Sequence, residues 1–456
     1  MSETHIQENK MGVQPVGTLL TSMAIPMMIS MLVQAFYNIV DSVFVARLSE
    51  NALTAVSLAF PLQSLCIAVG SGTAVGMNAV LSRSLGEKRQ DMVDRSANTG
   101  IFLFLCSYVV FALVGLFLAK PFLMAQTDVR EILDYGVDYI SICLSLSIGI
   151  FGQFCFERLL QSTGRTNLSM ITQIVGAVTN IILDPILIFG LFGLPRMEVA
   201  GAALATVIGQ FVAAGLAIWM NVKKNPEVHI RMKLIRFDKA IAGEIYRVGL
   251  PSIIMQSIGS VMTFCMNKIL IAFTTTATAV FGAYFKLQSF IFMPIFGLNN
   301  AMVPIISYNF GAAKPDRVKK TIRLSILTAM SIMGVGVLLF ELIPGTLLSI
   351  FDASEHMLEI GIPALRIIGL HLLLAGFCIP AGSVCQAIGN PVHSLITSVC
   401  RQLGVLIPAA WLLAQTGRLE LVWMAFPIAE LMAVTLSSMF LKKTMRSANA
   451  SMAERQ

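Results

Sequence analysis

The chain has 456 residues, of which 56% are hydrophobic and only 12% are charged, and its formal net charge is +7 at pH 7. Soluble domains carry about 25% charged residues, so this composition excludes a soluble globular protein and indicates an integral membrane protein. The basic residues lie in short loops between apolar segments, which argues against nucleic acid as a partner.

Twelve apolar segments are long enough to cross a bilayer as helices, which takes about 20 residues each. The first apolar segment follows a polar stretch of mixed charge, residues 1–14, which lacks the pattern of a cleaved signal peptide. We therefore expect the first apolar segment to be kept in the mature protein as a transmembrane helix. Prolines such as Pro26 and Pro185 should bend or break the helices that contain them. The predicted spans are residues 17–47, 52–83, 92–119, 131–157, 165–190, 198–221, 242–273, 277–309, 318–344, 357–387, 392–414 and 420–441.

Lysine and arginine are divided unevenly between the two sets of alternate connections. The set that begins at the N-terminus holds 22 of them, and the other set holds 5, namely Arg47, Lys120, Arg130, Arg196 and Arg418. Cytoplasmic loops are enriched in these residues. We therefore expect a multi-pass protein of the cytoplasmic (inner) membrane with both termini in the cytoplasm.

The second half of the chain repeats the first at an offset of 225 residues. Pro26 falls on Pro251, Gln63 on Gln288 and Gly72 on Gly297, and the register continues to Ile171-Thr172 on Ile396-Thr397. Six spans return the chain to the side where it began, so the repeats are parallel and related by an axis along the membrane normal. We predict an all-α, V-shaped transporter of twelve transmembrane helices in two six-helix lobes with a central cleft. Its parts are an N-terminal segment 1–16, an N-lobe 17–221, a linker 222–241, a C-lobe 242–441 and a tail 442–456.

Polar side chains form a stripe on the first span. Gln34, Asn38 and Asp41 stand at positions i, i+4 and i+7, which lie on one helix face. An ionised aspartate at the bilayer centre costs roughly 2.5–3.5 kcal/mol, so it is protonated, paired or next to water. The stripe predicts a polar site within the N-lobe.

A second carboxyl group lies in the fifth span. Asn180 precedes Asp184 by one turn, and Pro185 leaves the carbonyl of Ile181 without its helical partner, so an amide, a carboxyl and a carbonyl converge. Because spans one and five enter from the same side, Asp41 and Asp184 should lie at similar depth. The cluster predicts a cation or proton site; the simpler alternative is a pair of protonated acids that only hold helices together.

The matching positions of the second half lack these acids. Met266 stands opposite Asp41 and Ala409 opposite Asp184, which predicts ion coupling in the N-lobe alone. Lys268 and Lys286 are intramembrane cations of the second half. They could bind an acidic group of a substrate or pair with Asp41 across the cleft; the simpler alternative is that they extend toward the outer interface.

Four other intramembrane features have mainly structural interpretations. Arg401 and Glu430, near the middle of consecutive spans, predict an ion pair, and His371 predicts a hydrogen-bonded core residue or a proton relay. Glu157 adjoins Arg158 at the predicted end of a span and is expected at the surface. Gly70, Gly72 and Gly76 favour close helix packing over nucleotide binding.

The sequence contains no nucleotide-binding loop, no zinc-protease or serine-hydrolase pattern and no extramembrane segment large enough for a soluble active site. It therefore predicts a protein that is not an enzyme, binds no cofactor or resident metal, and draws on an ion gradient.

Several motifs together resemble MATE multidrug exporters, and most closely the branch that contains MepA and DinF. They are Pro26, Tyr37-Asn-Ile-Val-Asp41, Leu85-Gly-Glu-Lys88, Leu160-Gln-Ser-Thr-Gly164, Asn180-Ile-Ile-Leu-Asp184-Pro185 and Phe310-Gly-Ala-Ala-Lys314. The resemblance implies that Asp41, Asn180 and Asp184 bind the coupling H+ or Na+. It also implies alternating access, with hinges at Pro26 and Pro185, and export of amphipathic, often cationic small molecules by a monomer in the lipid bilayer.

Methionines near the predicted cleft, including Met27, Met31 and Met293, are candidates for an adaptable substrate pocket. The alternative is that they face lipid or core. A flippase or exporter of a lipid-linked or anionic amphiphile is the second functional interpretation, since Lys268 and Lys286 supply positive charge.

Overall fold

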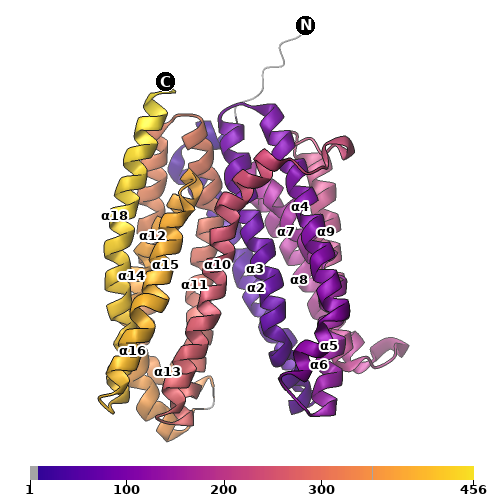
Figure 1. Ribbon diagram of the computed structural model, residues 1–456, viewed down its shortest axis with the longest axis vertical. Helices are drawn as coiled ribbons and strands as arrows, with labels where there is room; N and C mark the ends of the chain where they lie inside the picture. The colour runs from indigo at the N-terminus through magenta and orange to yellow at the C-terminus, as the bar shows by residue number, and fades with distance from the viewer. Residues whose placement is uncertain (1–8, 352, 456) are drawn as a thin grey trace. The chain divides into compact units, whose positions relative to one another are not determined.

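The computed structural model describes residues 9–351 and 353–455, and within these residues the regular structure consists of helices only (Figure 1). In this part of the chain, eleven helices are long and apolar enough to cross a membrane, and a bent pair, α6 (Arg130–Ser145) and α7 (Ile148–Ser162), makes a twelfth candidate span with a 43° bend. The protein is therefore an all-α, multi-pass membrane protein. Residues 1–8 of the expected N-terminal segment lie outside the described residues.

Each predicted span coincides with one helix or one interrupted helix. The second-last span contains a π-helical stretch, η3 (Cys400–Leu406), between α15 and α16, and α18 continues twelve residues beyond the predicted end at residue 441. The other spans are α2 (Val16–Ala46), α3 (Glu50–Gly86), α4 (Gln90–Phe117), α8 (Thr166–Phe189), α9 (Glu198–Lys224), α10 (Lys239–Ile271), α11 (Thr275–Gly311), α12 (Pro315–Leu342), α14 (Glu355–Ile388), α15 (Pro391–Val399) with α16 (Ile407–Ala414), and α17 (Leu419–Trp423) with α18 (Ala425–Ala453). Short helices α1 (Lys10–Val13), α5 (Ala119–Met124) and α13 (Pro344–Ser349), with the 3-10 turns η1 (Leu191–Gly193) and η2 (Met232–Leu234), complete the chain.

The helices group into two compact units. Unit 2 is Ile29–Ile253, and unit 1 is Met1–Met28 together with Ile254–Gln456. The chain passes from one unit to the other inside α2 and inside α10. Unit 2 therefore includes the first part of α10, and unit 1 includes the first part of α2.

Close glycine contacts occur at equivalent places in both units. A Cβ atom on Gly72 of α3 would lie 2.4 Å from Ile253 of α10, and one on Gly297 of α11 would lie 2.6 Å from the backbone of Met28 of α2. The two pairs are related by the 225-residue offset. A Cβ on Gly76 would lie 2.0 Å from the carbonyl oxygen of Ile245, so the predicted close packing of these glycines is confirmed.

A buried hydrogen bond repeats in the same way. The Ser82 hydroxyl donates to the carbonyl of Ser162 at 2.9 Å in unit 2, and the Ser307 hydroxyl donates to the carbonyl of Ala387 at 2.9 Å in unit 1. Both members are shifted by 225 residues. The contacts that hold the helices together have thus been kept in both halves.

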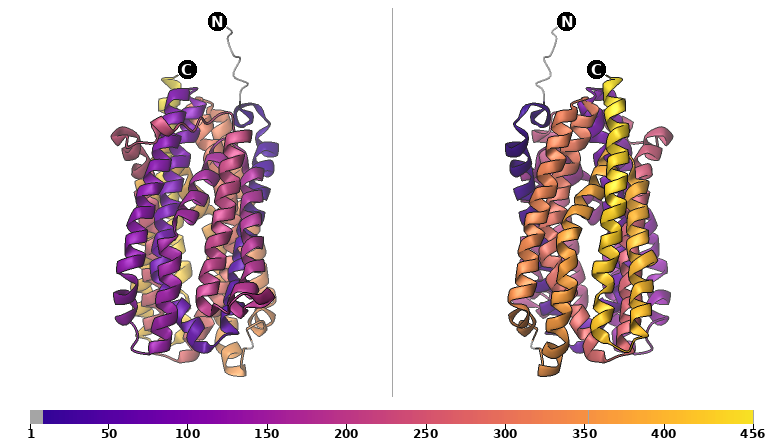
Figure 2. Two further views of the ribbon diagram at one scale, coloured as in Figure 1. Left: turned by 90° about the vertical axis from the view of Figure 1, so that its right-hand side faces the viewer. Right: turned by 90° about the vertical axis from the view of Figure 1, so that its left-hand side faces the viewer.

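In unit 1, α12, α14 and α18 run side by side (Figure 2). The beginning and the end of the chain meet near the last turn of α11. The amide of Asn309 donates to the carbonyl of Met11 at 2.9 Å, and the guanidinium of Arg455 lies 5.3 Å from the ring centre of Phe310. The two described ends of the chain therefore lie at one end of unit 1.

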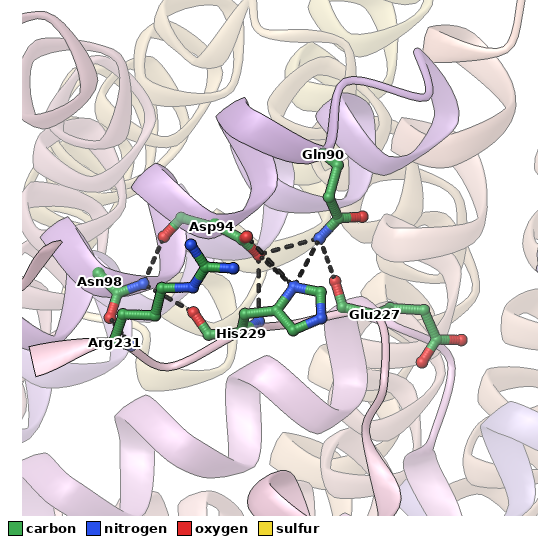
Figure 3. A network of polar contacts seen from close by, with 6 residues as sticks. All are labelled: Gln90, Asp94, Asn98, Glu227, His229 and Arg231. Atoms are coloured by element: carbon green, nitrogen blue, oxygen red, sulfur yellow. Dashed lines mark hydrogen bonds and ion pairs between the residues drawn. The ribbon is translucent and has the colours of Figure 1, made fainter. Parts of the chain in front are cut away.

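The connection between α9 and α10 is bound to the first three turns of α4 (Figure 3). Asp94 accepts a hydrogen bond from the backbone N–H of His229 at 3.1 Å and lies 3.2 Å from its ring Nδ1. Asn98 donates to the carbonyl of His229 and accepts from the N–H of Arg231. The predicted linker is therefore a fixed part of unit 2 along these residues.

Candidate functional site

The buried face of α8 carries the first two members of the candidate site. Asn180 is 2% exposed and Asp184 is fully buried. The Asn180 amide lies 3.5 Å from the carboxyl Oδ1 of Asp184 and 3.2 Å from the hydroxyl of Thr206 on α9. Because the two residues are one turn apart, the helix itself aligns the amide with the acid.

Asp41 of α2 completes a pair of carboxyl groups in unit 2. Its side chain is a direct neighbour of Asp184, close enough for the two groups to share a hydrogen bond when one carries a proton. The structure thus brings together all three residues that the sequence assigned to the site, although Asp41 and Asn180 are 139 residues apart in the chain.

Three oxygen atoms of this site are buried without a hydrogen-bond donor: Oδ1 of Asp41, Oδ1 of Asn180 and Oδ2 of Asp184. Within the described residues, neither carboxyl group takes part in an ion pair with lysine, arginine or histidine. Unfilled oxygen ligands suit a proton or a hard cation. The described residues contain no group of three or more His, Cys, Asp or Glu side chains that could hold a metal ion.

Aromatic and polar side chains surround the pair, and the sequence analysis assigned them no role. Tyr37 lies one turn before Asp41 and near Asp184, and Tyr139 of α6 lies near Asp41 and 3.5 Å from the Gln63 amide oxygen. Tyr37 could have been found from its spacing to Asp41. Tyr139 and Thr206 give no sequence signal, because single neutral polar residues are common in apolar helices.

The remaining predicted residues of the first and fifth spans have different surroundings. Gln34 is partly buried, whereas Asn38 lies on the exposed face of α2. Pro26 is buried two residues before the boundary between the units, and α8 continues past Pro185 to Phe189. Gly190, with φ at +73°, then ends α8 in the left-handed conformation that glycine tolerates.

In unit 1, a second buried acid has partners. Glu430 of α18, with a side chain 3% exposed, lies 3.2 Å from the guanidinium of Arg401 and 3.7 Å from Nδ1 of His371. The other ring nitrogen of His371 lies 2.7 Å from the hydroxyl of Tyr284. The predicted Arg401–Glu430 ion pair and the hydrogen-bonded core histidine are both confirmed.

The candidate substrate residues are spread over several environments. Lys268 and Lys286 are exposed, and their ammonium groups lie 5.7 Å and 5.8 Å from the ring centres of Phe264 and Phe351. Met27 is fully buried where α2 meets α11, whereas Met31 and Met293 are partly buried. Of the three methionines, Met27 has the surroundings of a core residue.

Glu157 is not at the surface, so that expectation was wrong. It is 5% exposed, and Arg158 is 8% exposed. The helix that carries them does not end at residue 157 as predicted but continues to Ser162, and α8 and α9 pack against it.

Comparison with known proteins finds one matching region in each half of the chain. A family model described as MatE matches residues 26–186 and 251–412. The multidrug export protein MepA of Staphylococcus haemolyticus is 28% identical over 425 residues, which cover 93% of this chain and 92% of that protein. An FAD transporter of Shewanella oneidensis is 25% identical over 430 residues and 92% of each chain. A solved structure titled as the outward-facing conformation of a multidrug resistance MATE family transporter of the MOP superfamily matches with a TM-score of 0.91 at 25% identity, over 97% of this chain and 99% of that one.

Proposed function

The chain belongs to the MATE family, whose members are transporters and not enzymes, and on this premise we propose that it exports amphipathic, cationic drugs and toxic compounds in exchange for H+ or Na+. The observation that carries the proposal is the pair Asp41–Asp184, which has buried oxygen atoms without hydrogen-bond donors and no cationic partner within the described residues. Asp184 is fully buried and Asp41 is partly buried. Its relatives named MepA are multidrug export proteins.

The coupling step follows from the charge of the pair. Two ionised carboxyl groups inside a membrane are unfavourable, so a proton or sodium ion that enters the site lowers the free energy of the state in which the site is closed to water. The Asn180 amide donates to the Asp184 carboxyl and also to the Thr206 hydroxyl, so Thr206 helps to orient Asn180 toward the acid that binds the ion. Release of the ion then favours the open state, and Pro26 and Pro185 mark the points where α2 and α8 bend.

The energy available is sufficient for export. One elementary charge that crosses about 100 mV provides about 2.3 kcal/mol, which supports roughly a 50-fold substrate gradient at one-to-one exchange. No bound cofactor is needed for this cycle.

We place the protein in the cytoplasmic (inner) membrane as a monomer, with both termini in the cytoplasm. The distribution of 22 basic residues on one side and 5 on the other supports this orientation. The position of both described chain ends at one end of unit 1 agrees with it.

The test is efflux of a cationic dye from vesicles that contain the purified protein, under separately imposed pH and Na+ gradients. We expect one gradient to drive dye movement and the Asp184→Asn protein to show none. Equal dye movement with and without both gradients would exclude ion-coupled export.

Export of an anionic amphiphile is the second candidate. It is favoured by the exposed cations Lys268 and Lys286 of α10 and α11 and by the similarity to the FAD transporter of Shewanella oneidensis. A vesicle assay that compares a cationic dye with FAD separates the two candidates, because a Lys268→Gln and Lys286→Gln double variant should lose only the movement of an anionic substrate.

A further inference from the structure

Glu157 is a buried acid that the proposed coupling site does not use. Its carboxyl Oε1 lies 3.0 Å from the amide of Gln153 and 3.0 Å from the hydroxyl of Thr172, and Oε2 lies 2.9 Å from the amide of Gln173. All three donors are neutral. A carboxylate at this depth is costly unless a cation neutralises it or a proton binds to it.

The side chains that face this region from the neighbouring helices are also neutral. Arg158, next in sequence on α7, is the charged group that acts on the Glu157 carboxyl. After the end of α7, Arg165 at the start of α8 forms an ion pair with Glu227 in the connection after α9. The neutral side chains that hydrogen-bond to residues of α7 are Ser169, Thr172 and Gln173 from α8, Asn221 from α9, Asn225 directly after α9, and Asn78 and Ser82 from α3.

The hydroxyl of Thr172 shows where a proton is held. It lies 2.7 Å from the carbonyl oxygen of Ser169 and 3.0 Å from Oε1 of Glu157, and both of these oxygens are acceptors when the carboxyl is ionised. A hydroxyl has a single hydrogen and cannot donate to both. Both short contacts are satisfied if Glu157 is protonated and donates to Thr172, while Thr172 donates to Ser169.

We propose that Glu157 is a second proton-binding site of unit 2, in which Oε1 carries the proton and donates it to the Thr172 hydroxyl. When the proton leaves, the hydroxyl turns from the Ser169 carbonyl to the carboxylate. The amides of Gln153 and Gln173 remain as donors to the ionised form. The site therefore has partners in both protonation states.

Unfilled acceptors lie beside this carboxyl. Gln161, which is 2% exposed, donates to the Ser169 hydroxyl at 2.8 Å, and its Oε1 is buried without a partner. The amide oxygen of Gln173 is also buried without a partner. Buried polar atoms are nearly always paired, so these two oxygens are suited to accept a hydrogen bond from the species that delivers or removes the proton.

The internal repeat distinguishes this acid from the scaffold. Contacts that the fold requires, such as those of Ser82 and Ser307, occur in both halves. At the 225-residue offset, Glu157 falls on Gly382 and Asp184 falls on Ala409, whereas Thr172 falls on Thr397. Both acids are thus absent from the second half although the surrounding helix is kept, which links Glu157 to the function of unit 2.

The site is separate from the Asp41–Asp184 pair. Thr172 and Asn180 are eight residues apart on α8, which is about 12 Å along the helix axis. Between them, α8 and α9 meet backbone to backbone, since a Cβ on Gly176 would lie 3.0 Å from the carbonyl oxygen of Gly209. Unit 2 therefore has two proton-binding sites, the Asp41–Asp184 pair and Glu157. The role of Glu157 in transport depends on the antiport proposed above.

The test is infrared difference spectroscopy of the purified full-length protein, recorded as the pH is changed. We expect the Glu157→Gln protein to lose one carbonyl stretching band of a protonated carboxylic acid and to release one proton fewer than wild type. Glu244→Gln, the same change at an exposed glutamate of α10, is the matched control. It should leave both quantities unchanged when the pH is kept above about 6, where exposed carboxyl groups stay ionised. An unchanged band and proton count in Glu157→Gln would overturn the proposal.

A second variant guards against misfolding. Thr172→Val removes the hydroxyl that accepts the proton while the volume is nearly kept, so the same carbonyl band should shift in frequency, and Thr172→Ser should restore it. A band that is indifferent to both substitutions would contradict the proposed hydrogen bond.

Transport assays distinguish the two proposals. If Asp184→Asn retains ion-coupled efflux, the proposed function fails whatever Glu157 does. If Asp184→Asn is inactive and Glu157→Gln exchanges one proton fewer per substrate molecule, both proposals hold. If Asp184→Asn is inactive and Glu157→Gln matches wild type in band, proton count and exchange ratio, only the proposal for Glu157 is excluded.

Discussion

Both units bury acidic side chains, but they compensate the charge in opposite ways. In unit 1, Glu430 has a fixed guanidinium from Arg401 and a histidine, His371, beside it. In unit 2, Asp41 and Asp184 face each other and leave three oxygen atoms of the site unfilled. A buried acid with a permanent cation is part of the scaffold, whereas a buried acid without one requires a mobile cation.

The internal repeat allows the acids of the two units to be compared on the same helix framework. The two units share the glycine contacts and the serine hydrogen bond, so they are built on the same helix packing. The difference between them therefore lies in a few side chains, and single substitutions can test it.

The largest effect should follow from neutralising the uncompensated acids. Asp41→Asn or Asp184→Asn removes the charge that attracts the coupling ion, so we expect efflux to be abolished. The melting temperature in detergent should stay the same or rise, because the substitution removes an unfavourable buried charge. Dye efflux and thermal unfolding of the same preparations would measure both quantities. Full efflux by either variant would remove the distinction between the two units.

In unit 1 we expect the substitution of a buried charged residue to lower the stability of the protein. Arg401→Met leaves Glu430 as a buried charge without its main partner, and removal of one partner of a buried pair costs about 3 kcal/mol of unfolding free energy or more. Thermal unfolding of the variant in detergent would measure this loss.

The double variant Arg401→Met with Glu430→Leu provides the control for that experiment. It removes both charges, so most of the lost stability should return. If the double variant is as unstable as the single one, the pair is not the reason for the loss. If the single variant is as stable as wild type, Glu430 is not held by Arg401.

The sequence predicted the helices well because long apolar segments are unambiguous at the length of a bilayer. It also indicated that Asp41 and Asp184 lie close together, since a charged residue inside an apolar segment is easily recognised, and the structure shows them as neighbours; their role as a coupling site stays a prediction. Tyr139 and Thr206 were missed because neutral polar residues give no such signal. The surface position expected for Glu157 was wrong, because α7 runs five residues past its predicted end and α8 and α9 cover it.

A smaller loss of stability is expected when the hydrogen bond between Tyr284 and His371, next to Glu430, is removed. Tyr284→Phe removes the hydroxyl that lies 2.7 Å from the His371 ring and leaves a buried nitrogen without its partner. We expect a loss of about 1 kcal/mol of stability with efflux retained. Thermal unfolding and dye efflux would measure these. Loss of efflux with unchanged stability would instead assign His371 a role in proton movement.

The smallest effect should come from a charge pair near the surface, which Arg95 of α4 forms with Asp238, the residue before α10. Loss of this pair should change the stability less than loss of the buried pair in unit 1. The guanidinium of Arg95 lowers the pKa of Asp238 below its ordinary value. An acid whose pKa is lowered in the folded protein adds stability above its unfolded pKa of about 3.9, and loses that contribution as the pH falls through the folded value. Asp238→Asn keeps the cap on the N–H groups of Ala240 and Ile241 but removes the charge. We therefore expect wild type to exceed this variant by at most about 1 kcal/mol at pH 7, and the difference in melting temperature to vanish as the pH drops below about 4. A difference that stayed constant over this range would show that the pair contributes through its shape and not through its charge.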